Sequence, residues 1–165
     1  MKIENRTPHQ DGFYMPGEFE PQDGVILIWP KRPGSWPYEA KKARKVFAEI
    51  ANKLAETEKV YMLTEPETEA AARELLCENV EILTIPTDDA WARDVGPTFV
   101  TDGKEVRGIN WSFNAWGGTY DGLYQDCKRM IRLQKNFVNR LVMTIMMRLL
   151  LCWKAVLSMQ TDRER

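Results

Sequence analysis

The stretch TDDAWARDVGPTFV, which begins at residue 87, combines acidic and aromatic side chains in an order that suits a planar cation. Asp88, Asp89 and Asp94 lie within seven residues, and Trp91 stands between them. A carboxylate can accept two parallel N–H bonds from a guanidinium group, and an indole face attracts the same cation. The local alternative is structural: Asp88 or Asp89 caps a helix, and the Arg-Asp pair is a weak surface ion pair.

A second stretch, INWSFNAWGGTYDG, spans residues 109–122 and adds aromatic rings, an amide and two adjacent glycines. The double glycine allows the backbone to approach a ligand closely. Asn114 and Trp116 are the side chains of this stretch that we expect to contact a ligand. Trp111 and Phe113 alternate along a strand, so we expect them to close the core instead.

The segments around these motifs alternate between short apolar runs and amphipathic stretches, which predicts an α/β domain. Strands are expected at GVILIWP (24–30), KVYML (59–63) and NVEILTIP (79–86). Because the third run ends at Pro86, the acidic residues follow the end of a strand, where ligand sites of α/β sheets concentrate. The following PTFVTDGKEVRGINW predicts a hairpin, with Asp102 and Gly103 in a tight primed turn.

Two helices are expected between these strands. The first should begin with Ser35 as its N-cap and Pro37 in its first turn, and should end near Glu58. Its buried face is predicted by apolar residues at helical spacing: Val46, Phe47, Ile50, Ala51 and Leu54. The second helix should cover ETEAAARELLC, residues 67–77, and place Cys77 as a small buried residue at its end.

The composition is typical of a soluble globular domain, with 44% hydrophobic and 28% charged residues. The polar N-terminal arm has no apolar leader segment. Cys77, Cys127 and Cys152 show neither metal-ligand spacing nor an even disulfide framework. We therefore expect a cytoplasmic protein with reduced thiols.

Three stretches carry a resemblance to a known family: DGFYMPGEFEPQDGVILIWP, TDDAWARDVGPTFV and WSFNAWGGTYDGLY, in this order. Together they resemble the N-terminal part of the agmatine deiminases, which belong with the microbial peptidylarginine deiminases in the guanidine-modifying (pentein) superfamily. The resemblance covers residues 6–126 and implies an α/β propeller of five blades. This chain would supply only the N-terminal blades, a partial pentein-type α/β propeller.

The resemblance also implies a reaction, the hydrolysis of agmatine to N-carbamoylputrescine and ammonia on a route to putrescine, without a cofactor or metal. A cysteine thiolate attacks the guanidinium carbon, a histidine protonates the departing ammonia, and acidic residues hold the guanidinium. On this basis Asp94 is the catalytic carboxylate on the guanidinium, Trp91 is the wall of the site, and Asp88 contacts the charged end of the substrate. Asn114 and Trp116 complete the predicted substrate-binding set. Full-length relatives could form homo-oligomers.

The family pattern then stops. Its catalytic histidine belongs to a later Gly-Gly-Ser-Ile-His-type motif, and its nucleophilic cysteine lies near the C-terminus of a much longer chain. The single histidine of this sequence is His9, between a proline and a glutamine in the polar N-terminal arm. None of the three cysteines stands in the family's nucleophile context. The chain as written is therefore expected to be truncated and inactive as a deiminase.

The composition changes abruptly at residue 127. Residues 1–126 carry a net charge of −8 and all the glycines and prolines, whereas residues 127–165 carry a net charge of +7. This predicts a deiminase-like domain over 1–126 and an out-of-family basic tail over 127–165 that is helical or disordered. The tail is too short and too charged for a good membrane span, and its aromatic residues are too sparse to favour nucleic acid.

A shifted reading frame explains this tail. When LCWKAVLSMQTD is reverse-translated with permitted codons and regrouped by one base, it gives VLEGGSIHADG, the histidine motif of the family. Restoring one G at the codon for residue 127 likewise gives DWQKDD. We therefore expect a single-base deletion at that codon.

Other functions remain open at this point. The chain could be a non-catalytic binder of guanidinium or polyamine compounds, or a relative of the peptidyl-arginine deiminases. It could also be an interaction module that uses its basic tail on a membrane or nucleic acid. A small guanidinium compound, agmatine, is the expected partner, and we expect neither nucleic acid nor membrane as a partner.

Overall fold

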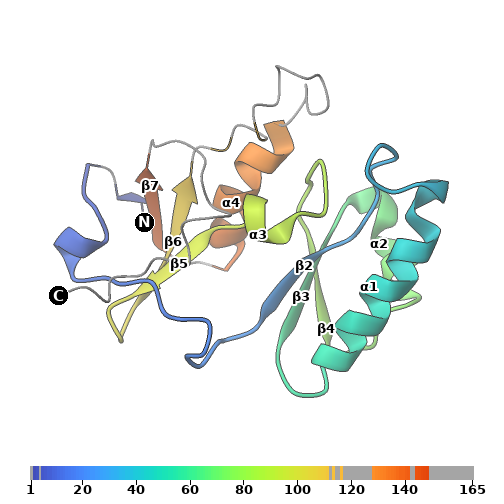
Figure 1. Cartoon of the computed structure of the whole chain (residues 1–165), viewed down its shortest axis with the longest axis horizontal. Helices are drawn as coiled ribbons and strands as arrows, with labels where there is room; N and C mark the ends of the chain where they lie inside the picture. Colours follow the sequence, from blue (N-terminus) through green and yellow to red (C-terminus); the bar gives the residue numbers. More distant parts are fainter. Residues whose placement is uncertain are drawn as a thin grey trace.

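The computed structural model describes residues 2–3, 5–111, 113, 116, 128–141 and 144–148 (Figure 1). A parallel three-stranded sheet has the order β2-β3-β4, with β2 at Val25–Ile28, β3 at Val60–Thr64 and β4 at Val80–Thr84. A four-stranded sheet has the order β1-β7-β6-β5, with bounds Lys2–Ile3, Thr144–Arg148, Val106–Trp111 and Thr98–Thr101. The α/β class predicted from the sequence is confirmed.

The parallel sheet is covered on one face by α1 (Lys41–Leu54) and α2 (Pro66–Arg73), which lie together in Figure 1. Alternate residues of β3 point to opposite faces, as the period of a strand requires. On the α1/α2 face, Val60 and Met62 pack with Ala48, Ala51 and Ala72. Small residues on both helices permit this close approach to the sheet.

The opposite face of the parallel sheet packs against α4 (Lys128–Arg140). Ile28, Leu63 and Leu83 from the three strands form one core cluster with residues of this helix: Met130, Leu133 and Phe137. The ring of Phe137 contacts Tyr61 of β3 edge-on, with the ring centroids 6.0 Å apart. Consequently α4 is part of the main core.

The same helix also contacts the second sheet. Val138 of α4 lies directly against Gly108 of β6, and the side chain of Gln134 accepts a hydrogen bond from the backbone N–H of Trp111. Strand β6 pairs with β5 in antiparallel register and with β7 in parallel register. Helix α4 therefore connects the two sheets.

The first helix differs from its prediction. Tyr38, Glu39 and Ala40 have left-handed backbone angles, with φ of 55°, 56° and 60°, so the regular helix begins only at Lys41. The three residues form the short 3₁₀ segment η2 (Tyr38–Ala40). The predicted N-cap role of Ser35 is wrong, because its hydroxyl donates to the carboxylate of Asp89 instead.

The predicted inward face of this helix is also partly wrong. Phe47, Ala51 and Leu54 pack on the sheet, but Val46 and Ile50 are exposed. The second helix ends at Arg73, earlier than predicted, and Cys77 is exposed. The residues of α1 that are fully buried against the sheet are Ala48 and Ala51.

The hairpin β5–β6 is confirmed, but its turn is not the predicted primed type. Four residues connect the strands, and Gly103 has a φ of 87° whereas Asp102 does not have a positive φ. The carboxylate of Asp102 accepts hydrogen bonds from the backbone N–H groups of Lys104 and Glu105. This side chain stabilises a longer loop in place of a two-residue turn.

The described residues on the two sides of position 127 pack against each other. The segment predicted as a separate tail is helical over Lys128–Arg140, as expected, but it lies in the core, and Thr144–Arg148 pairs with both β1 and β6. The described parts of this segment thus pack as part of the fold, and the division of the chain at residue 127 stays a prediction. Over the described part of the chain, no helix is long and apolar enough to cross a membrane.

Candidate functional site at the C-terminal edge of the parallel sheet

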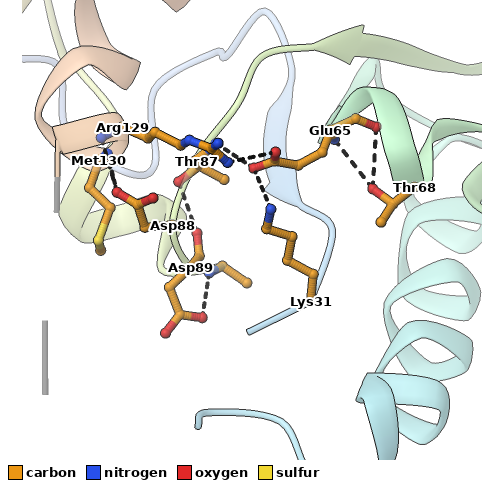
Figure 2. A network of polar contacts seen from close by, with 9 residues as sticks. Lys31, Glu65, Thr68, Thr87, Asp88, Asp89, Arg129 and Met130 are labelled. Carbon is orange, nitrogen blue, oxygen red and sulfur yellow. Dashed lines mark hydrogen bonds and ion pairs between the residues drawn. The ribbon is translucent and has the colours of Figure 1, made fainter. Parts of the chain in front are cut away.

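The three parallel strands end at one edge, and the polar residues that follow them meet there. Lys31 follows β2, Glu65 follows β3, and the loop from Thr87 to Asp89 follows β4. Figure 2 shows these side chains in the space between the start of α2 and the start of α4. The prediction that the TDDAWARD acids follow the end of a strand is confirmed.

Glu65 is the centre of this polar network. Its side chain is 4% exposed and forms ion pairs with Lys31 at 2.9 Å and Arg129 at 3.0 Å. The backbone N–H of Thr87 donates to the same carboxylate at 2.9 Å. A buried carboxylate needs such partners, because its desolvation is otherwise costly. Glu65 therefore joins the loop after β4 to β2 and to α4 (Figure 2).

Asp88 is half-buried and caps the N-terminus of α4. Its Oδ2 accepts hydrogen bonds from the backbone N–H groups of Arg129 at 3.0 Å and Met130 at 3.1 Å (Figure 2). The alternative that Asp88 caps a helix is therefore correct, but the capped helix is α4, which starts 40 residues later. It is not the short α3 (Ala92–Val95) that follows Asp88. One carboxylate oxygen of Asp88 remains outside this cap.

Asp89 is buried, with 1% of its surface exposed, and its carboxylate collects donors from two segments. Oδ1 accepts from Trp36 Nε1 at 3.1 Å and from the backbone N–H of Ala90 at 2.8 Å. Oδ2 accepts from the hydroxyl of Ser35 and from Trp91 Nε1, the latter at 3.1 Å. Asp89 therefore fixes the loop before α1 to the loop before α3.

The two indoles bound to Asp89 are stacked. The ring centroids of Trp36 and Trp91 lie 6.1 Å apart, with 29° between their planes. On its other side, Trp36 meets Phe47 of α1 edge-on at 5.7 Å. Trp91 is 43% exposed, so part of its ring is accessible to a ligand. The role of Trp91 as the wall of a substrate site stays a prediction.

Asp94 lies in α3, three residues after Trp91, and is half-buried. Its backbone N–H donates to the carbonyl of Trp91, but its carboxylate makes no hydrogen bond or ion pair with the residues that the structure describes. The neighbouring Arg93 does not pair with Asp94, because its guanidinium lies 2.6 Å from Glu18. The surface pair considered as a local alternative is therefore absent from the described contacts.

The second predicted stretch is described only in part. Asn114 lies outside the described residues. Trp116 is 46% exposed and meets Phe113 edge-on, with the ring centroids 5.2 Å apart. Phe113 is buried in the core cluster that also holds Ala90 and Val95 of the first stretch, so its predicted core role is confirmed.

Sequence reasoning missed three residues of this region: Ser35, Trp36 and Glu65. Their bonds to the first stretch span 22 to 54 positions, and no local pattern encodes such contacts. The one available signal was Glu65 itself, an acid directly after an apolar strand. Within the described ranges, no group of three or more potential ligand side chains could hold a metal ion.

Comparison with known proteins then decides the family. The sequence profile of the Porphyromonas-type peptidyl-arginine deiminases matches residues 14–149. The chain belongs to this family. The match continues past residue 127, so the change in composition does not coincide with the end of the family similarity.

Relatives within this deiminase family carry agmatine deiminase names. A provisionally named agmatine deiminase of Selenomonas ruminantium is 50% identical over 131 residues, which cover 76% of this chain and 35% of that protein. One from Mycoplasma capricolum is 51% identical over 122 residues, which cover 73% and 33%. The chain thus spans about a third of the length of these relatives.

Solved structures of this deiminase family share the fold. The agmatine deiminase of Enterococcus faecalis, in a structure described as catalysing its reaction, superposes with a TM-score of 0.85 and 34% identity over 89% of this chain and 40% of that one. A structure named as an arginine deiminase from Porphyromonas gingivalis gives a TM-score of 0.65 at 20% identity, over 82% of this chain and 40% of that one, which shows the fold alone.

Proposed function

We propose that this chain is the N-terminal portion of an agmatine deiminase-like hydrolase, and that its TDDAWARD loop is the guanidinium-binding element. One observation carries the proposal. Of the three acids in the loop, the carboxylate of Asp89 is buried and accepts four hydrogen bonds, and Asp88 caps a helix, whereas Asp94 is half-buried and its backbone N–H donates to the carbonyl of the exposed Trp91.

The chemistry of the site follows from these two side chains. Asp94 would accept N–H bonds from the guanidinium and hold its charge, while the face of Trp91 restricts the planar group to one orientation. Asp88 offers its remaining oxygen to the charged end of the substrate, and Trp116 and Asn114 complete the binding set. In the complete reaction water replaces the amino group, which leaves as ammonia and yields N-carbamoylputrescine, a precursor of putrescine.

We further propose that neither Cys77 nor His9 supplies the reactive groups for that reaction. A nucleophile and a proton donor must reach the guanidinium carbon. Cys77 follows α2 and precedes Val80, whose partner Val60 begins β3, so Cys77 lies at the opposite edge of the parallel sheet from Asp94. His9 is exposed in the short η1 segment (His9–Asp11) of the N-terminal arm. Neither residue is placed to attack a guanidinium held by Asp94.

Titration calorimetry with agmatine on the full chain tests the binding element. Asp94→Asn should weaken agmatine binding about tenfold or more, because a charge-assisted bond is replaced by a neutral one. Asp23→Asn serves as the matched control, since Asp23 is an exposed acid just before β2, at the other edge of the sheet. Equal affinities of the parent chain and Asp94→Asn would contradict the assignment.

A second candidate function is non-catalytic binding of guanidinium or polyamine compounds, and the positions of Cys77 and His9 favour it for this chain. An ammonia-release assay with agmatine and with a peptidyl-arginine substrate distinguishes the candidates. Binding of agmatine without ammonia release supports the binder, and release at a rate comparable to that of a full-length deiminase supports the enzyme. Preference for the peptide would place the chain with the peptidyl-arginine deiminases.

We also propose that residues 127–165 derive from a shifted reading frame. The regrouped codons that restore the histidine motif support this origin, and so does the change in charge at residue 127. Sequencing the gene through the codon for residue 127 tests it. An intact frame that encodes this same segment in an independent isolate would overturn the proposal.

A further inference from the structure

Behind the accessible indole of Trp91 lies a carboxylate that no ligand could reach. Asp89 is 1% exposed, yet it accepts hydrogen bonds from the indole N–H groups of both Trp36 and Trp91, each at 3.1 Å. Any role of Asp89 in binding must therefore act through these rings. The other donors, Ser35 and the backbone of Ala90, fix the carboxylate from either side.

We infer that Asp89 is a positioning residue that holds Trp36 and Trp91 as a two-indole wall and polarises this wall towards a cation. The inference rests on the proposed function, since it assumes that the wall faces a guanidinium compound. It deepens that proposal, because it assigns part of the cation preference, beyond the contribution of Asp94, to a residue that never touches the ligand.

The geometric part of the argument comes from the two N–H bonds. Each indole has one donor, and both donors end on one carboxylate, so Asp89 holds the two rings close to each other. The rings are stacked, with centroids 6.1 Å apart and planes 29° apart, and the shared carboxylate supports this arrangement. Phe47 supports Trp36 from α1 at 5.7 Å, and Trp91 is the more exposed ring of the pair.

The electrostatic part comes from the charge of the acceptor. A hydrogen bond from an indole N–H to a carboxylate draws the proton outward and raises the electron density of the ring, which strengthens the attraction between its face and a cation. The same hydrogen bond changes the attraction between the ring face and a neutral group of equal shape much less. The wall should therefore favour a guanidinium over a urea.

Agmatine and N-carbamoylputrescine form a suitable pair of probes, because the second carries a neutral urea where the first carries a guanidinium. Asp89→Asn keeps the size of the side chain but removes the charge and one of the acceptor oxygens. We expect agmatine to bind this variant about three- to tenfold more weakly, with a clearly smaller change for N-carbamoylputrescine. Equal loss for both ligands, or no loss for either, would overturn the inference.

A spectroscopic measurement tests the wall without a ligand. Stacked indoles give an exciton couplet in the far-ultraviolet circular dichroism spectrum, and we expect the parent chain to show it. Trp36→Phe should abolish the couplet, which assigns it to this pair, and Asp89→Asn should reduce it strongly. Ser35→Ala is the matched control, since it removes one donor to Asp89 and leaves both indole bonds in place, so it should retain the couplet. A couplet that persists in Asp89→Asn would overturn the inference.

The two measurements separate this inference from the proposed function. If the parent chain shows the couplet but binds no agmatine, the proposed function fails while the anchoring by Asp89 is still decided by the spectra. If Asp89→Asn loses its cooperative unfolding transition, Trp91→Phe replaces it, because it keeps a ring but lacks the N–H to Asp89. Trp91→Phe should reduce the preference for agmatine over N-carbamoylputrescine about three- to tenfold, and an unchanged preference would overturn the inference.

Discussion

The guanidinium of Arg129, in the first turn of α4, lies 3.0 Å from the buried carboxylate of Glu65, the residue that precedes α2 (Figure 2). The same turn of α4 is capped by Asp88. The backbone of the first turn of α4 is thus bound to the loop after β4 through Asp88, and the side chain of Arg129 is bound to the start of α2 through Glu65. The position of the candidate site depends on residues on both sides of position 127.

Replacement of Glu65 should destabilise the fold more than replacement of either cation. Glu65→Ala leaves Lys31 and Arg129 without a carboxylate and the backbone N–H of Thr87 without an acceptor, at a cost of about 2–3 kcal/mol. This cost is smaller than for a fully buried ion pair, because the cations can return to water; Arg129 is already 54% exposed. Arg129→Ala should cost only about 0.5–1 kcal/mol. Urea denaturation compares the two, and equal losses would contradict the central role of Glu65.

Gly108 and Val138 provide a test of the packing of α4 on β6. A Cβ atom on Gly108 would lie 2.3 Å from Cγ2 of Val138, so Gly108→Ala should destabilise the fold by about 1–3 kcal/mol. Val138→Ala alone removes packing, but the double variant should recover a large part of the loss, because the smaller side chain vacates the space. Thermal unfolding of the four proteins measures this coupling. Strictly additive losses would mean that residues 108 and 138 do not touch.

The carboxylate of Asp102 should make the hairpin sensitive to acid. Hydrogen bonds from the backbone N–H groups of Glu105 and Lys104 hold the pKa of Asp102 below its ordinary value. A depressed pKa means that the stabilisation is complete at neutral pH and is lost as the pH falls below about 4, through the folded-state pKa. Asp102→Asn keeps an acceptor oxygen but not the charge. Its stability difference from the parent should shrink in acid, and a difference independent of pH would refute the shift.

Local patterns predicted the elements of this fold better than their connections. The apolar runs at β2, β3 and β4 and the hairpin β5–β6 follow from short-range periodicity, which is why they could be found from the sequence. The start of α1 could not, because three left-handed residues delay it. Trp91 is exposed and Asp94 is half-buried, and their binding roles stay predictions. The partners of Asp88 and Asp89 are distant in sequence, and only the folded chain brings them together.

Asp88 can act as a helix cap, a substrate ligand or both, and two substitutions separate these roles. Asp88→Ala removes the acceptor of two N–H groups at the start of α4 and should cost about 1 kcal/mol of stability. Asp88→Asn retains a capping oxygen, so its stability should stay close to that of the parent. If Asp88 also contacts the charged end of agmatine, Asp88→Asn should nevertheless weaken agmatine binding several-fold in calorimetry, since the neutral amide no longer attracts that charge. Parent-like affinity in a stable Asp88→Asn variant would restrict Asp88 to its capping role and leave Asp94 as the acid of the loop that binds the ligand.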